Sequence, residues 1–170
     1  MSENWPARQV EMRRVSELVP NARNSRTHSE EQIAQIAGLM KAYGWTVPVL
    51  VDEEGVIIAG HGRITAARML GLSEVPVMVA RGWSDAQKRA YMIADNAIAE
   101  KAGWNPEMLK LELQDLADAD FRMELTGFDA GELSMRMYEP DFHPAGEDSQ
   151  SRLDEKKKVR CPECDHEFAP

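Results

Sequence analysis

A change of pattern between residues 57 and 70 constrains the fold more than any other feature of the sequence. The apolar run Ile57–Ala59 leads into Gly60–Arg63 (Gly-His-Gly-Arg), and apolar residues then recur at helical spacing at Ile64, Ala67 and Leu70. A buried strand that passes into a helix through glycines leaves the first N–H groups of that helix unpaired. Such a place prefers an anion.

Arg63 is the side chain of this loop that suits a phosphate best. Its guanidinium presents a planar fork of donors, while Gly60 and Gly62 permit close approach of the backbone to a ligand. From the residues alone, the loop is either a phosphate site or a tight turn that carries a surface arginine. His61 is a turn residue or a general base, and the lack of a neighbouring carboxylate favours the turn residue.

The apolar patterns predict the elements that surround this loop. Ser followed three residues later by Gln marks a capping box, and Asn before Pro is a preferred helix start. Strands are expected around Val10 and Met12, at Val47 to Val51, at Val56 to Ala59 and at Val75 to Ala80. Helices are expected after Ser29, after the glycine loop, from Ser84 to about Glu100, after Asn105, and from Asp129 to near Met137.

Asp95 and Asn96 lie inside the helix expected from Asp85 to Glu100. Short polar residues are poor helix formers and therefore need a reason to be there. One reading is a solvated helix face or a local kink. The other is that their oxygens hold a hard cation such as Mg²⁺, which keeps most of its waters and bridges to phosphates.

The net charge of −9 is unevenly distributed along the chain. Residues 1–94 hold 11 Lys and Arg against 10 Asp and Glu, whereas residues 95–141 hold 4 against 12. Affinity for DNA comes largely from neutralising phosphates, so the acidic segment is a poor candidate for a DNA groove. A polyanion should meet the first half of the chain.

The two cysteines, Cys161 and Cys164, lie near the C-terminus and are followed by His166. They resemble half of a zinc ribbon, because a structural zinc site needs four ligands and this segment offers at most three. A vestigial reduced pair and a redox pair are the alternatives. No apolar run is long enough to span a bilayer and no signal pattern opens the chain, so we expect a cytoplasmic protein with no membrane partner.

The order of these segments resembles the ParB N-terminal domain of the ParB/sulfiredoxin superfamily. The resemblance covers residues 7–100 and rests on Pro48–Val51, on Ile57–Ala67 with its Gly-x-x-Arg and Ala-Ala, on Gly71-Leu72 and on Val75–Val77. It implies an α+β fold, a small mixed sheet with packed helices. A helical extension (101–137), a linker (138–158) and a zinc-ribbon-like knuckle (159–170) would follow.

The resemblance also implies a ligand, CTP or ATP with Mg²⁺. In partition proteins of this family the Gly-x-x-Arg segment holds the phosphates of CTP, which implicates the loop residues Gly60, His61, Gly62, Arg63 and Ile64. An acidic-Asn pair in a later helix holds the magnesium, which implicates Asp95 and Asn96. An arginine in the loop before the first long helix is also typical, and Arg23 and Arg26 are both candidates for it.

The closer resemblance is to a phage and mobile-element branch whose members accompany a DNA methyltransferase. Sulfiredoxin activity is not expected, because that chemistry needs a thiolate in the loop where His61 stands. The leading hypothesis is a DNA-associated accessory protein of a phage or mobile element that binds a nucleoside triphosphate with Mg²⁺, and slow hydrolysis of the nucleotide is left open. The alternatives are a metal-dependent nuclease and a non-catalytic module that docks to a methyltransferase or terminase. A homodimer would be one way to complete the zinc site.

Overall fold

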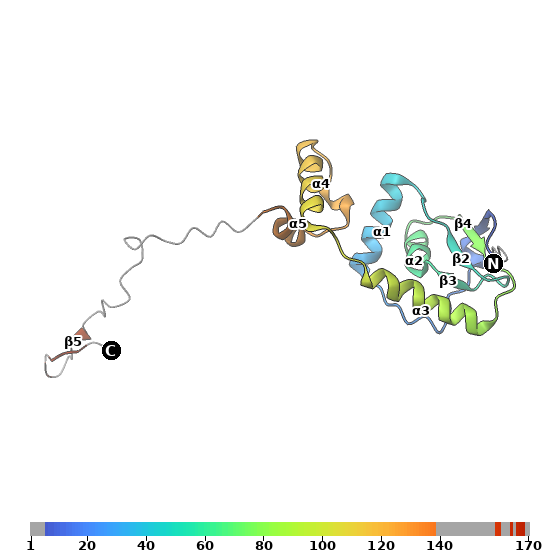
Figure 1. Ribbon diagram of the computed structural model, residues 1–170, viewed down its shortest axis with the longest axis horizontal. Helices are drawn as coiled ribbons and strands as arrows, with labels where there is room; N and C mark the ends of the chain where they lie inside the picture. The colour runs from blue at the N-terminus through green and yellow to red at the C-terminus, as the bar shows by residue number, and fades with distance from the viewer. Residues whose placement is uncertain (1–5, 139–158, 161–163, 165, 169–170) are drawn as a thin grey trace. The chain divides into compact units, whose positions relative to one another are not determined.

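The computed structural model describes residues 6–138, 159–160, 164 and 166–168, and the chain forms two units, residues 1–137 and 138–170 (Figure 1). The first unit contains β1 (Val10–Arg14), η1 (Val15–Glu17), α1 (Glu30–Tyr43), β2 (Val49–Val51), β3 (Ile57–Ala59), α2 (His61–Met69), β4 (Glu74–Val79), α3 (Asp85–Lys101), α4 (Pro106–Asp118), η2 (Met123–Thr126) and α5 (Ala130–Met137). In the second, β5 (Val159–Arg160) pairs antiparallel with β6 (Glu167–Phe168).

The sheet of the first unit is mixed, with the strand order β1-β4-β2-β3. β4 is antiparallel to β1 and parallel to β2, and β2 and β3 form the expected antiparallel hairpin. Val75, Val77 and Val79 alternate toward the core along β4, which is the period of a strand with one buried face. The α+β fold predicted from the sequence is confirmed.

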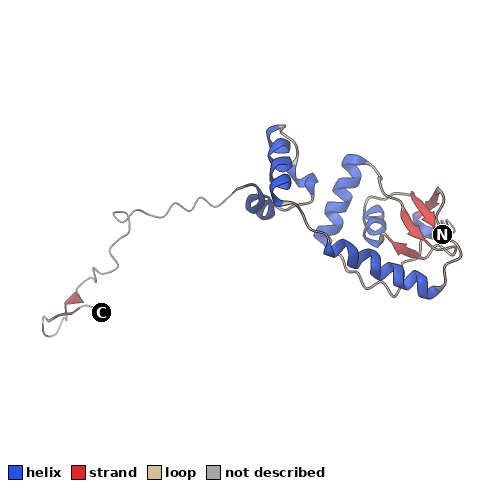
Figure 2. Ribbon diagram, in the orientation of Figure 1, coloured by secondary structure: helices blue, strands red, loops and turns tan. Residues whose placement is uncertain are grey.

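Helices α2 and α1 are stacked in that order on one face of this sheet. α2 contacts both β2 and α1, so it lies between the sheet and α1 (Figure 2). Ile64 and Ala67 of α2 join the strand residues in the main core, whereas Ala66 faces Ile33 and Ala37 of α1. The small residues Ala66 and Ala67 are fully buried and allow this close packing.

α1 begins at the predicted Ser29 cap, but only one of the two hydrogen bonds of the predicted capping box forms. The Ser29 hydroxyl accepts the Gln32 N–H at 3.2 Å. The Gln32 side chain, however, does not complete the capping box but contacts the His28 ring, with its Oε1 2.8 Å from Nδ1. At α3 both halves of the box form, between Ser84 and Gln87.

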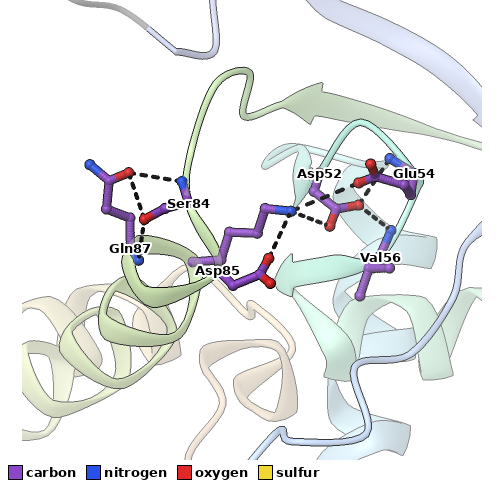
Figure 3. A network of polar contacts seen from close by, with 7 residues as sticks. Asp52, Glu54, Val56, Ser84, Asp85 and Gln87 are labelled. Carbon is purple, nitrogen blue, oxygen red and sulfur yellow. Dashed lines mark hydrogen bonds and ion pairs between the residues drawn. The ribbon is translucent and has the colours of Figure 1, made fainter.

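α3 is attached to the β2–β3 turn by a cluster of charges (Figure 3). The Asp52 carboxylate is 5% exposed, accepts the N–H groups of Glu54 and Val56, and lies 2.9 Å from the Lys88 ammonium. Glu54 and Asp85 lie 3.8 and 3.7 Å from the same ammonium. Met92 is the single buried residue of α3, so polar contacts hold much of this helix in place.

α4 and α5 pack against each other after the predicted Asn105 cap and Pro106 start. Leu113 of α4 is buried, and the Trp104 and Phe128 rings meet edge to face at 5.8 Å. The Arg136 guanidinium lies over the Phe128 ring at 4.6 Å, a cation–π contact. The last helix, α5, also lies where the sequence predicted it, from residue 130 to 137.

The predicted linker (138–158) and the predicted knuckle (159–170) lie mostly outside the residues that the structure describes. The linker lies outside the described residues except for Tyr138, and so does Cys161 of the knuckle. Cys164 and His166 are described and exposed. No helix in the part of the chain that the structure describes is long and apolar enough to cross a membrane.

Candidate functional site

The strand β3 ends at Gly60, which turns the chain into α2. Gly60 has φ +100°, a conformation that favours glycine, and it is the N-cap of the helix. A Cβ there would lie 3.3 Å from Val49 Cγ2 and from Nε and Nη2 of Arg63. The glycine is therefore required by both its backbone angle and the closeness of the arginine.

The N–H groups of His61, Gly62 and Arg63 open α2 and are not hydrogen-bonded within the part of the chain that the structure describes. They form the positive end of the helix dipole. The N–H of Ile64 is already bonded to the Gly60 carbonyl at 3.1 Å, and its side chain is 1% exposed in the core. Three N–H groups, and not that of Ile64, are thus free for an anion.

Gly62 has a different reason to be glycine. A Cβ at this position would lie 3.1 Å from both His28 Nε2 and Ile36 Cδ1. The missing side chain lets the end of the β1–α1 loop and α1 approach α2 closely. That approach is what encloses the glycine loop.

Arg63 turns its guanidinium toward the start of β2. Nη1 donates to the carbonyl of Pro48 at 3.0 Å and to that of Val47. Burial lowers the pKa of Arg63, and the Asp95 carboxylate acts against this shift. Arginine stays charged across the physiological range, so the group remains a cation beside the loop.

A cavity of about 190 Å³ lies over the glycine loop. Gly60, His61, Gly62 and Arg63 line one side of it, and Asp95 and Asn96 of α3 line another. The β1–α1 loop contributes Asn24, Arg26 and His28 to the lining. Segments more than 30 residues apart in sequence therefore converge on the unpaired N–H groups.

Arg26 is held in the cavity wall from two directions. Asn24 and Arg26 exchange two hydrogen bonds, Asn24 Nδ2 to the Arg26 carbonyl at 2.9 Å and the Arg26 N–H to Asn24 Oδ1 at 3.2 Å. The Arg26 guanidinium is paired with the Glu100 carboxylate near the end of α3. α3 is thus tied to the loop at this end and to Asp52 through Lys88 at the other.

Asp95 and Asn96 present oxygens to the cavity. The Asn96 Nδ2 donates to the Met92 carbonyl at 2.7 Å, which leaves its Oδ1 as the atom available to a ligand. Asp95 is exposed, and its charge adds to the rise that burial causes in the pKa of Tyr91. These two oxygens suit a hard cation.

The cavity contains two histidines, His28 and His61, whose charges interact. Burial lowers the pKa of His61, and the charge of His28 lowers it further. His61 Nε2 accepts the Asn21 N–H at 3.4 Å, which fits a neutral ring. At neutral pH, the His61 ring is therefore an uncharged part of the cavity lining.

The structure brings together most of the residues that the sequence singled out for a nucleotide site. Of the two candidate arginines, Arg26 lines the cavity, whereas Arg23 is not among its lining residues. Asn24 and His28 were missed, although both stand in the polar, arginine-rich segment directly before α1. Among the described residues, no three His, Cys, Asp or Glu side chains gather closely enough to hold a metal by themselves.

Comparison with known domain families assigns residues 1–97 to the ParB N-terminal domain. The chain belongs to the ParB N-terminal domain family. Residues 107–162 match a second family, the ParB-methyltransferase HTH domain. The acidity of residues 95–141 gave no indication of this second match, because it made the segment a poor candidate for a DNA groove.

Two curated relatives of this ParB-like chain each align with less than half of it. The ParB-like nuclease domain-containing protein YnaK of Escherichia coli (strain K12) is 56% identical over 77 residues, which is 45% of this chain and 88% of YnaK. The probable chromosome 2-partitioning protein ParB of Deinococcus radiodurans is 37% identical over 86 residues. These cover 48% of this chain but 29% of that partition protein.

A solved ParB structure shares the fold. The C-terminally truncated chromosome-partitioning protein ParB from Caulobacter crescentus, complexed with CTP-γ-S, matches with a TM-score of 0.63 and 24% sequence identity. The match covers 76% of this chain and 77% of that one. It shows that the two chains have the same architecture.

Proposed function

We propose that residues 7–100 bind a nucleoside triphosphate with Mg²⁺ in the cavity over the glycine loop. The chain would act as a DNA-associated accessory protein in DNA modification or partition of a phage or mobile element. The observation that carries the proposal is the convergence of three unpaired N–H groups, Arg26, and the oxygens of Asp95 and Asn96 on one cavity. In this arrangement, donors for phosphate would lie beside ligands for a cation.

The fold neighbour from Caulobacter supports CTP as the first nucleotide to test, because that protein was solved with CTP-γ-S. ATP is the second candidate. Pockets that enclose a whole small-molecule ligand typically measure roughly 300–1,000 Å³. At about 190 Å³, the cavity suits the phosphate groups, with the base and sugar outside it.

A neighbouring apolar hollow is available for the rest of the nucleotide. It has a volume of about 470 Å³, shares Ile36 and Arg63 with the cavity, and is lined by Tyr43 and Trp45. The Trp45 indole donates to the Val47 carbonyl at 2.8 Å, which fixes the ring. Arg63 would then lie between the phosphates and the base.

Mg²⁺ fits the donor set that α3 offers. Asp95 and Asn96 provide one carboxylate and one amide oxygen, and phosphate oxygens and water would supply the remaining ligands of an octahedral ion. The ion would neutralise phosphate charge when bound. Any phosphoryl transfer here would rest on positioning by Arg26 and by the loop N–H groups.

The segment that follows supports a role with a partner enzyme. Residues 107–162 match a domain family named for ParB-methyltransferases, so we propose that the helical extension, residues 101–137, docks to a DNA methyltransferase. A metal-dependent nuclease is the second candidate, supported by the similarity to YnaK, whose name describes a ParB-like nuclease domain. Nicking of plasmid DNA by the purified chain in the presence of Mg²⁺ would favour the nuclease over the docking protein.

The test is thermal unfolding of the full chain with each of the four ribonucleoside triphosphates, with and without Mg²⁺. A ligand at about 100 times its dissociation constant stabilises a protein by about 2.7 kcal/mol, which is an easily measured rise in Tm. We expect the largest rise with CTP and Mg²⁺. No rise with any of the four would refute the proposal.

A further inference from the structure

A second hollow lies at the opposite end of α2 from the glycine loop. It has a volume of about 540 Å³ and is lined by Arg14, Val15, Ser16, Arg68 and the turn Gly71–Glu74. α2 has nine residues, so the two ends are separated by roughly 14 Å along the helix. We call this feature the Arg14–Arg68 hollow.

Backbone contacts fix the shape of the Arg14–Arg68 hollow. The Val15 N–H donates to the Ser73 carbonyl at 2.9 Å, which joins the end of β1 to the turn after α2. Gly71, with φ +69°, makes that turn, and a Cβ there would meet nothing within 4 Å. The end of β1 is therefore held against this turn, and the space beside Gly71 is open.

One arginine of the hollow is anchored and the other is free. Arg68 Nη2 donates to the Leu18 carbonyl at 3.0 Å, which orients its guanidinium and leaves other N–H groups unused. Arg14 makes no ion pair or side-chain hydrogen bond within the described residues. Its cross-strand neighbour is Glu74, yet no salt bridge joins the two.

The donors of the hollow share one chemistry. Two arginines and two serines, Arg14, Arg68, Ser16 and Ser73, line the hollow, and Glu74 is the single acidic residue of the lining. The C-terminal end of α2 carries partial negative charge, which Arg68 in its last turn offsets. Guanidiniums with nearby hydroxyls are donors that match phosphate oxygens.

We propose that the Arg14–Arg68 hollow binds a phosphate group, distinct from any phosphate held by the glycine loop. A phosphodiester of duplex DNA and a free phosphorylated small molecule are the two sources of that group. Because the hollow has two arginines, binding of DNA there would release about two cations, and the affinity would decrease only slowly as the salt concentration rises.

The experiment is a ¹⁵N NMR titration of the full chain at low ionic strength, once with inorganic phosphate and once with a mixed-sequence duplex of about 20 base pairs. We expect saturable shifts of the Gly71, Leu72 and Ser73 amides in the wild type. Shifts with phosphate indicate that a free anion suffices, and shifts with the duplex alone indicate nucleic acid. Amides of residues 60–62 report the other cavity separately, so the two proposals fail independently.

Two variants make the titration specific. Arg14→Gln removes the unpaired guanidinium and no contact that holds the fold, so it should fold normally and lose most of the response, with affinity about 3–10-fold weaker. Arg89→Gln removes an exposed arginine of α3 that lines neither cavity and should respond as the wild type does. No shift at residues 71–73 with either ligand, or an Arg14→Gln response equal to that of the wild type, would overturn the proposal.

Discussion

The Arg63 guanidinium donates to the Pro48 carbonyl at 3.0 Å, so the arginine of the glycine loop also holds the start of β2. Replacing it should have two separable effects. Arg63→Ala is expected to lower the stability of the free protein by about 1.5–3 kcal/mol through loss of charged hydrogen bonds. It should also abolish the rise in Tm with CTP and Mg²⁺, measured against the variant's own Tm. Arg89→Ala is the matched control, and a full nucleotide response in Arg63→Ala would contradict the assignment.

The metal proposal predicts a dependence on Asp95 that is specific to Mg²⁺. Asp95→Asn removes the carboxylate of the proposed ligand pair and leaves the loop N–H groups intact. CTP affinity in Mg²⁺ should fall by about tenfold, or about 1.4 kcal/mol, while the weaker binding in EDTA stays unchanged. Isothermal titration calorimetry in both buffers measures this, and an equal loss in both would show that Asp95 does not act through a metal.

His61 predicts the pH dependence of nucleotide binding. Burial holds its pKa below the ordinary value in the free protein, so the ring is neutral at pH 7. A bound phosphate would favour the charged ring and raise this pKa, so binding takes up a proton and affinity increases as pH falls from about 8 to about 6. His61→Gln should flatten the profile, and His28→Gln tests the neighbouring ring. An affinity that is independent of pH would argue against phosphate contact at His61.

Asp52 predicts the response of the fold to acid. Burial acts to raise the pKa of Asp52, but the Lys88 ammonium and the N–H groups of Val56 and Glu54 outweigh it, and the net shift is downward. Because the folded pKa lies below the unfolded one, this stability is complete above about pH 4 and is lost as pH falls through the folded pKa. Asp52→Ala should cost about 1–3 kcal/mol at pH 7, since it leaves partly buried N–H donors without an acceptor. Urea unfolding of Asp52→Ala beside Glu53→Ala provides the comparison.

The C-terminal cysteines predict conditional zinc binding. Cys161, Cys164 and His166 provide at most three ligands, and an open site forfeits affinity that a closed tetrahedron has. A purified monomer should therefore hold less than stoichiometric zinc by elemental analysis, and zinc should increase when the chain self-associates. Truncation after Tyr138 should leave folding and the nucleotide response unchanged, because residues 1–137 form a unit. Stoichiometric zinc in a strict monomer would show that the site closes within one chain.

The elements of this fold could be predicted because their signals are local. Ser29, Ser84 and Asn105 cap helices by each accepting the N–H group three residues later, and alternation along β4 follows from one buried face. Long-range contacts leave no such local signal. Nothing adjacent in sequence indicates that Asp52 pairs with Lys88, or that Arg26 pairs with Glu100.

The same distinction applies to the candidate site. The Gly60–Arg63 turn could be singled out because glycines between an apolar strand and a helical pattern mark the unpaired N–H groups at a helix start, and Gly60 does have a positive φ there. The choice between Arg23 and Arg26 depends on how the β1–α1 loop folds over α2, which the loop's composition does not determine. Asn24 and His28 were missed for that reason, since His28 enters the cavity wall by packing against Gly62 and Asn24 enters it through its hydrogen bonds with Arg26.

The single buried residue of α3, Met92, bears on how this helix moves. An element with little buried surface opens at a lower free energy than the sheet, so α3 amides should exchange hydrogen faster than those of β4. Asp95 and Asn96 belong to this helix, and a ligand that engages them would slow its exchange. Binding of a ligand in the cavity could then be detected as slower hydrogen exchange of the α3 amides, with no change in the exchange of the sheet amides.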